Sequence, residues 1–330
     1  MLVSAVLCEA ALRMVYPVPW YGYVYLPPQQ HLFQYDGTLG WVGRPDSVGV
    51  FASLDFEHTV HHDEYGFRNN TDFYHPEKRN LLIVGDSFGW GWGVGDDEVV
   101  SSAMNDEAPG VNAYNLSAPG YGTDQAYLMV KRFFDNHADY RPEAVVLLFF
   151  INDFKDNVKT VRYGYPKARF ILDEHGALQL TNLPIPNVPQ VYEGERKLKR
   201  LPRTFGRNFH LYNLLDYFFR KKTFPHTKLM RGTRSLTPAE QETVVLTTAI
   251  VAAMKRLVES RGASLLLVTV FSGNDPHYPP FRKMLDKEGV RHERFERTVI
   301  PRNELWNDRH MNARGHRSLA LQILKWLDGD

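Results

Sequence analysis

The sequence predicts a three-layer α/β/α sandwich around a mostly parallel, flavodoxin-like sheet. Short apolar runs alternate with longer amphipathic patterns, and glycine or polar residues follow the apolar runs. Such alternation implies a parallel sheet covered by helices on both faces. The predicted strands are 80–84, 111–116, 144–150, 264–271 and 291–295, and the predicted helices are 97–105, 123–136, 238–260, 280–287 and one beginning after Asn312.

The first 77 residues precede this pattern. Residues 1–16 are mostly apolar, but Glu9 interrupts them and they fall short of the roughly 20 residues that span a bilayer. We expect either the remainder of a truncated membrane anchor or an amphipathic helix packed on the domain. Residues 17–77 are expected to form a β-rich extension, because 49–51 and 56–60 have extended, partly alternating character.

The core is expected to comprise 78–154 and 236–330, with 155–235 as an insertion or lid. The insertion has 17 Lys or Arg against 6 Asp or Glu, an excess that could contact an anionic polysaccharide or a membrane surface, or form a solvated face. No recognisable module for nucleic acid surrounds this charge. Its densest cluster is Arg196, Lys197, Lys199, Arg200 and Arg203.

The first core strand ends in Gly85-Asp86-Ser87-Phe88-Gly89. A serine among glycines at a strand end could be only a turn or a helix cap. It is also a candidate nucleophile, which needs a base to take its proton and a third group to orient that base.

A carboxylate and an imidazole stand near the other end of the chain, at Asp308 and His310. They could simply lead into the helix that Asn312 would cap. A helix there would also hold the imidazole in place. Asn307 is three residues before His310, but an amide cannot supply the charge that stabilises imidazolium, so Asp308 is the preferred acid.

The serine motif also satisfies the G-x-S-x-G elbow of α/β-hydrolases. In those enzymes several strands precede the elbow, whereas Ser87 ends the first core strand. The chain instead resembles the SGNH or GDSL hydrolase superfamily, which carries a G-D-S block near the start of its domain and an Asp-x(x)-His block near its end. The resemblance covers roughly 78–154 and 236–330.

The middle blocks of that family match Gly120, in 118–122, and Asn152, in 149–153. The resemblance implies an oxyanion hole built from the backbone N–H groups of Ser87 and Gly120 and the side chain of Asn152. Asn152 could instead be a strand-end cap, and Gly120 could only permit a tight turn. Phe150 stands where the family has glycine.

Other candidate sites are weaker. Trp90 and Trp92 could wall a substrate groove or pack the loop, and their glycine-rich run lacks the register of a nucleotide-binding motif. Three histidines at 58, 61 and 62 lack a paired carboxylate set, so we expect no metal site. The single cysteine, Cys8, excludes an internal disulfide framework and lies outside every motif. The resemblance implies that no cofactor is needed.

The motifs therefore predict a serine esterase, and the resemblance to relatives in bacterial polysaccharide modification implies O-acetylated carbohydrate as the preferred substrate. An O-acyltransferase using the same residues is the alternative, and a non-catalytic carbohydrate-binding or scaffold protein is a second one, suggested by Phe150. Membrane-proximal, extracytoplasmic relatives carry strings like those at 39–45 and 65–69. The resemblance thus favours an extracytoplasmic or membrane-associated bacterial protein, with a cytoplasmic location left open.

Overall fold

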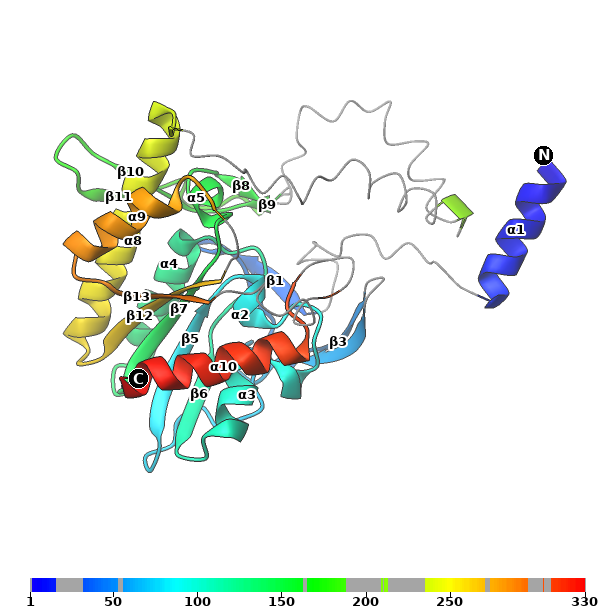
Figure 1. The fold of residues 1–330 in the computed structure, drawn as a ribbon, viewed down its shortest axis with the longest axis horizontal. Helices are drawn as coiled ribbons and strands as arrows, with labels where there is room; N and C mark the ends of the chain where they lie inside the picture. The colour runs from blue at the N-terminus through cyan, green and yellow to red at the C-terminus, as the bar shows by residue number, and fades with distance from the viewer. Residues whose placement is uncertain are drawn as a thin grey trace.

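A five-stranded parallel sheet forms the centre of the protein in the computed structural model (Figure 1). Its order is β13-β12-β7-β5-β6, which is 2-1-3-4-5 when the core strands are numbered along the chain and read from β6, and this confirms the flavodoxin-like prediction. The strands are β5 (Arg79–Gly85), β6 (Val111–Asn115), β7 (Ala144–Phe149), β12 (Ser264–Val270) and β13 (Arg291–Phe295). The structure describes residues 2–15, 32–52, 56–162, 165–187, 209, 211–212, 235–270, 274–295, 305 and 310–329.

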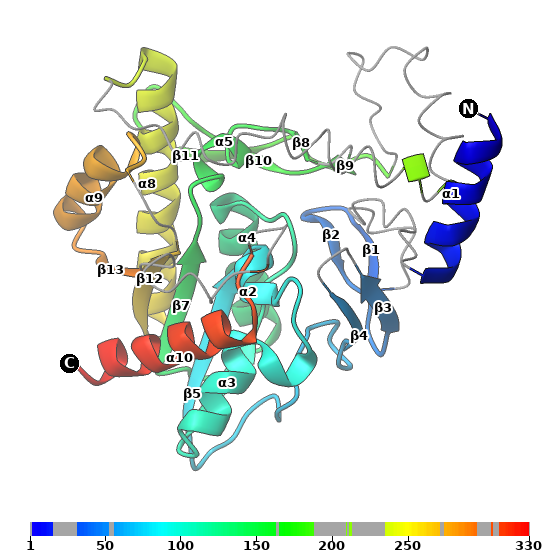
Figure 2. The ribbon, with the colours of Figure 1, turned by 45° about the vertical axis from the view of Figure 1, so that its right-hand side comes forward.

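Helices cover both faces of the sheet (Figures 1 and 2). Alternate side chains of a strand point to opposite faces, so Leu81 and Ile83 of β5 enter one core while Leu82 and Val84 enter the other. The first core is closed by α3 (Val100–Glu107) and α10 (Ala313–Asp328), and the second by α4 (Thr123–Asn136), α8 (Pro238–Ser260) and α9 (Tyr278–Lys287).

Two helices begin earlier or later than the sequence predicts. The segment predicted as helical from 97 starts as a 3₁₀ turn, η2 (Asp96–Glu98), and the α-helix begins only at Val100. Helix α9 begins at Tyr278 rather than Pro280, because proline is tolerated in a first helical turn where its missing N–H needs no partner.

The last helix begins as predicted. The side chain of Asn312 accepts a hydrogen bond from the Gly315 N–H at 3.0 Å, and Gly329 ends the helix in the left-handed conformation. His310 is thus held two residues ahead of a capped helix.

The N-terminal segment contains a helix and two β-hairpins. Helix α1 (Leu2–Val15) leaves several apolar side chains exposed, and none of the helices that the structure describes is long and apolar enough to cross a bilayer. The hairpins pair β1 (Phe33–Asp36) with β2 (Gly40–Gly43), and β3 (Val48–Ala52) with β4 (Glu57–His61). Their inward side chains, including Trp41 and Phe51, join the same core as α4 and α8.

The described part of 155–235 begins with a short helix, α5 (Asp153–Asp156), and continues as two small hairpins. One pairs β8 (Val161–Arg162) with β9 (Tyr165–Pro166), and the other pairs β10 (Arg169–Leu172) with β11 (Leu178–Thr181). The basic cluster at 196–203 lies outside the described residues.

Candidate active site

Ser87 lies at the carboxyl end of β5, where the strand turns sharply into the short helix α2 (Ser87–Trp90). Asp86 caps this helix by accepting the Phe88 N–H at 2.9 Å. The turn depends on glycine: a Cβ on Gly85 would come within 2.6 Å of a backbone oxygen, and one on Gly89 within 2.2 Å of the Ser117 hydroxyl oxygen.

The structure brings Ser87 and His310 together. Ser87 Oγ lies 2.8 Å from His310 Nε2, although 223 residues separate them in the chain. The backbone oxygen of His310 also accepts a hydrogen bond from the Leu305 N–H at 2.8 Å. A hydroxyl within hydrogen-bond reach of an imidazole is the arrangement that activates a serine, and a turn or a helix cap would not require it.

Aromatic rings surround the imidazole. The Trp92 ring stacks on His310 at 5.4 Å and 26°, and the Phe88 ring lies 4.8 Å away. Phe150, which departs from the family pattern, packs on Phe88 at 4.5 Å. Phe150 therefore contributes a second layer of aromatic packing, and the contact between Ser87 and His310 forms in its presence.

Trp90 and Trp92 are both buried, with exposed fractions of 1% and 3%. Trp90 packs against Phe51 of the N-terminal hairpins, 5.2 Å between ring centroids. The sequence left open whether these tryptophans wall a substrate groove or pack the loop. Both side chains pack here, and Trp92 packs on the candidate base itself.

The predicted acid, Asp308, lies outside the described residues, as does Asn307. Its role in orienting His310 remains a prediction.

The two predicted oxyanion residues follow the strands on either side of β5. Gly120 has φ of 77° in the turn after β6, and Asn152 follows β7 by three residues. Since β5 lies between β6 and β7, all three candidate donors come from the carboxyl ends of neighbouring parallel strands. Their joint oxyanion role remains a prediction.

The amide of Asn152 is oriented by a buried carboxylate. Asn152 Nδ2 donates to Asp156 Oδ2 at 2.8 Å, and the side chain makes no capping hydrogen bond to α5. A primary amide carries two N–H groups, so one remains to meet another acceptor. The Asn152 side chain therefore does not act as a simple strand-end cap.

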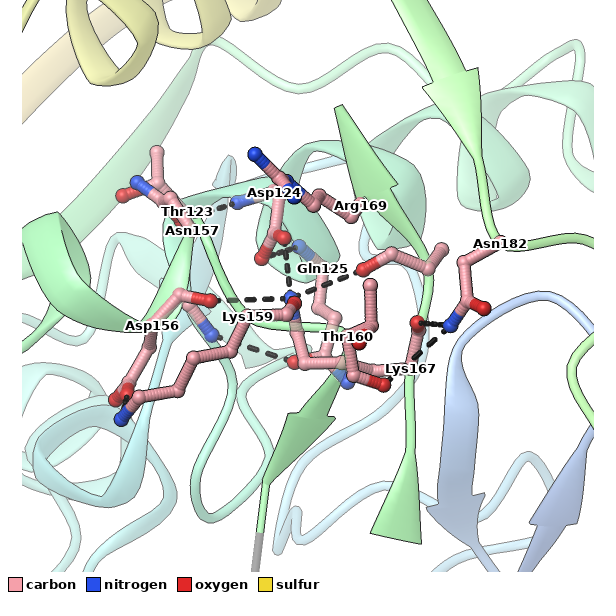
Figure 3. Close-up of polar contacts among 12 residues, drawn as sticks. Thr123, Asp124, Gln125, Asp156, Asn157, Lys159, Thr160, Lys167, Arg169 and Asn182 are labelled. Atoms are coloured by element: carbon pink, nitrogen blue, oxygen red, sulfur yellow. Dashed lines mark hydrogen bonds and ion pairs between the residues drawn. The ribbon is translucent and has the colours of Figure 1, made fainter. Parts of the chain in front are cut away.

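Asp156 is neutralised by residues at the start of the insertion. Its carboxylate forms ion pairs with Lys159 at 2.8 Å and with Arg162 at 3.0 Å. Nearby, the wholly buried Lys167 pairs with Asp124 and donates to backbone oxygens, including that of Asp156 (Figure 3). Part of the insertion's positive charge therefore lies inside the protein, while the basic cluster at 196–203 lies outside the described residues.

Two further aspartates near the site have raised pKa values. Burial raises the pKa of Asp86 to about 6. Burial, with the charge of Asp86 nearby, raises the pKa of Asp153 well above its usual range. A protonated Asp153 next to Asn152 would not oppose negative charge developing at an adjacent oxyanion.

No group of three or more metal-ligating side chains occurs among the residues that the structure describes. His61 Nδ1 lies 2.8 Å from Asp96, and His62 Nδ1 lies 3.2 Å from the Ser47 hydroxyl. Burial lowers the pKa of His62 to about 4, so its ring is neutral at pH 7.

Sequence reasoning assigned no role to several residues that support this site. Asp156 gave no signal, because nothing in a single sequence shows which neighbour an asparagine contacts. Arg68 and Asn69 lie in the string 65–69, which the resemblance marked without assigning chemistry to it. Arg68 proves to contact the segment after Ser87 directly, and Asn69 reaches it through Asn115.

Comparison with known proteins found no matching family model and no matching curated protein, but solved structures do match. The Est2A acetyl xylan esterase of Butyrivibrio proteoclasticus has a TM-score of 0.42 and 9% identity, with 78% of this chain and 65% of that one covered. The esterase EstA of a Pseudoalteromonas species has a TM-score of 0.44 and 11% identity, over 76% of this chain and 100% of that one. A G-D-S-L family lipolytic protein of Veillonella parvula has a TM-score of 0.39 and 10% identity, over 74% and 96%.

The chain thus spans less than two thirds of the Butyrivibrio enzyme, and at such identities the likeness concerns the course of the chain alone. The assignment of chemistry rests on Ser87, His310 and their surroundings. By their names, these three similar proteins are an acetyl xylan esterase, an esterase and a lipolytic protein of the G-D-S-L family.

Proposed function

We propose that this protein is a serine esterase that works through an acyl-enzyme on Ser87. The observation that carries the proposal is the 2.8 Å contact between Ser87 Oγ and His310 Nε2 at the carboxyl end of the central strand. The turn into α2 presents the hydroxyl at the sheet edge where parallel α/β proteins bind ligands.

In the proposed first step, His310 Nε2 accepts the proton of Ser87 Oγ while that oxygen attacks the ester carbonyl carbon. The carbonyl π electrons move to its oxygen, where the Ser87 and Gly120 N–H groups and the free N–H of Asn152 would meet the charge. Each donor of this kind contributes about 3–4 kcal/mol in other hydrolases. Asp308 would stabilise the imidazolium.

Collapse of this intermediate breaks the bond to the alcohol oxygen, which takes the proton from His310. Water then attacks the acyl carbon while His310 accepts its proton. The second intermediate collapses by breaking the bond between Ser87 Oγ and the acyl carbon, Ser87 takes the proton back from His310, and the carboxylic acid leaves. If a sugar hydroxyl replaces water in this second half, the same residues perform an acyl transfer.

Acetyl groups on carbohydrate are the proposed substrate class. Phe88 and Trp92 occupy the space beside the imidazole, which favours a small acyl group over a long chain. Acetyl xylan is named for the Butyrivibrio enzyme and for an enzyme of Geobacillus stearothermophilus, which has a TM-score of 0.35.

The test is hydrolysis of p-nitrophenyl acetate, butyrate and octanoate by the wild type and by Ser87→Ala. We expect turnover that falls with acyl length and labelling of the wild type by a fluorophosphonate, with both lost in a folded Ser87→Ala. Acetylated xylo-oligosaccharides and free oligosaccharide acceptors, added in parallel, separate hydrolysis from transfer. Labelling that persists in Ser87→Ala would remove Ser87 from the mechanism, and a wild type that neither turns over nor labels would favour the non-catalytic alternative.

A further inference from the structure

Arg68, from the N-terminal extension, is buried with an exposed fraction of 2%. Its guanidinium donates to three backbone oxygens of the segment that follows the nucleophile: Trp90 at 3.2 Å, Gly91 at 2.6 Å and Val94 at 2.6 Å. Its Nε pairs with Asp96 at 2.6 Å. One side chain thus contacts four residues between the last residue of α2 and the first residue of η2.

The Trp90 oxygen lies in the last turn of a helix, where carbonyl groups have no hydrogen-bond partner within the helix, and α2 is only one turn long. The Gly91 oxygen, just beyond the helix, also accepts the Val94 N–H at 3.4 Å. The planar fork of arginine carries donors on three separate nitrogens and so reaches acceptors that lie apart, whereas lysine has its three donors on a single atom. Gly91 allows the close approach, because a Cβ there would lie 3.1 Å from Arg68 Nη1.

The neighbouring Asn69 makes a second connection. Its Oδ1 accepts the Asn115 N–H at 2.7 Å, and its Nδ2 donates to the Asn115 backbone oxygen at 3.3 Å. The Asn115 side chain in turn donates to the Gly89 backbone oxygen at 2.8 Å. The two adjacent residues therefore hold the nucleophile helix on two sides.

The held segment reaches the candidate base by two contacts. Trp92 stacks on the His310 ring. Gly93 lies against Leu305, where a Cβ would come within 2.4 Å of the Leu305 side chain, and the Leu305 N–H donates to the His310 oxygen. Movement of this segment would therefore displace both Ser87 and His310.

We propose that Arg68 and Asn69 form a clamp that positions Ser87 against His310, so that the N-terminal extension is part of the catalytic machinery. This inference rests on the proposed esterase function. Both are positioning residues, since they act through backbone atoms of 89–94 and through Asn115. A buried charge often adds little to stability compared with an apolar side chain of similar size, so its use here is explained by the geometry that it imposes.

The test compares Arg68→Lys with Arg132→Lys. Arg132, on α4, makes a bidentate ion pair with Asp36 of β1 at 2.7 and 2.8 Å, so it also joins the extension to the core but contacts no part of the nucleophile segment. For each variant, kcat and KM for p-nitrophenyl acetate and the second-order rate of fluorophosphonate labelling of Ser87 are measured at a temperature well below the unfolding transition. Tm is measured separately from a melting curve.

We expect Arg68→Lys to lower kcat and the labelling rate by about 10- to 100-fold with KM changed less than about threefold, the size of effect that a displacement near 1 Å produces. Arg132→Lys should lower Tm and leave both rates near those of the wild type. Asn69→Ala, which keeps every Arg68 contact, should lower the labelling rate in the same direction and carries the test if Arg68→Lys does not fold.

The clamp is overturned if Arg68→Lys, or Asn69→Ala in its place, lowers Tm while retaining wild-type rates per folded molecule. That result leaves the esterase assignment intact, provided that wild-type Ser87 is labelled. A wild type without labelling at Ser87 overturns both, so the two failures are distinguishable.

Discussion

The carboxylate of Asp156 accepts a hydrogen bond from the side-chain nitrogen of Asn152 at 2.8 Å, and this contact decides which end of the amide is the donor. A carboxylate cannot receive a hydrogen bond from the amide oxygen, so the amide of Asn152 presents its NH₂ group to Asp156. Lys159 and Arg162 form ion pairs with the same carboxylate, so the Asn152 amide is tied into a wider polar network.

Asn152→Ala should lower kcat by about 100- to 1,000-fold with little change in KM, because the amide would meet charge that exists only in the transition state. Steady-state kinetics and a melting curve on the same preparation decide the matter. Loss of a purely structural hydrogen bond to Asp156 would instead cost about 1.5–3 kcal/mol of stability and leave kcat intact in the folded fraction. A lower Tm with unchanged turnover would defeat the oxyanion role.

Asp308→Asn should reduce kcat by about 10⁴-fold if Asp308 orients and stabilises His310, because the amide keeps the size of the side chain and removes its charge. His310→Ala should abolish turnover, since no proton acceptor would remain beside Ser87. Asn307→Ala is the matched control and should leave the rate near that of the wild type. A strong effect at Asn307 with none at Asp308 would exchange their roles.

Lys167→Met should destabilise the protein by about 3–5 kcal/mol, because it leaves the buried carboxylate of Asp124 without its partner. Combining it with Asp124→Leu should recover part of the loss, since no uncompensated charge would remain. The control is Lys131→Met, which breaks an exposed pair with Asp135 and should cost less than about 1 kcal/mol. Urea unfolding of the four proteins measures the differences, and equal losses at Lys167 and Lys131 would contradict the prediction.

His316→Leu should change how stability depends on pH. Burial, with the positive charge of Arg68 nearby, lowers the pKa of His316 to about 3, and neither ring nitrogen has a hydrogen-bond partner among the described residues. Below pH 6.5 the unfolded chain binds a proton at this histidine that the folded protein does not, so the wild type loses stability as the pH falls towards 3.

The variant lacks this proton uptake. As the pH falls from roughly 6 to 4, the free energy of unfolding of the variant should therefore rise relative to that of the wild type by about 1.4 kcal/mol per pH unit. Above pH 7 the difference between the two proteins should be constant. Urea unfolding at a series of pH values gives this difference, in which the contributions of other titrating groups cancel. A difference independent of pH would show that the folded protein takes up the proton as readily as the unfolded chain.

The order and limits of the core elements were largely predictable, because each buried strand is a short apolar run and each long helix has an apolar stripe. Strand β13 has the predicted limits, and the ends of β5, β6, β7 and β12 lie within one residue of those predicted. The start of α3 was missed because its first turn is held in 3₁₀ form, with the Gly95 N–H bound to the Glu98 side chain.

Within the site, Ser87 and His310 could be found because each stands in a short motif. Arg68 could not, because its value lies in contacts with backbone atoms of residues 90–94, and backbone acceptors leave no mark in the sequence. Lys167 gave no signal beyond its place among the basic residues of the insertion, since its burial against Asp124 depends on how the insertion folds back onto α4.

The distance along the chain between Ser87 and His310 has a consequence for biosynthesis. Their contact joins residues 223 positions apart, so it is among the most non-local contacts that a protein of this length can make. Non-local contacts form late, because closing the long loop between the two residues costs conformational entropy. During translation the parallel sheet can begin to assemble around β5, β6 and β7 while the base is still unsynthesised. A nascent chain would therefore carry an inert serine, and hydrolytic activity would appear only when the final helix docks.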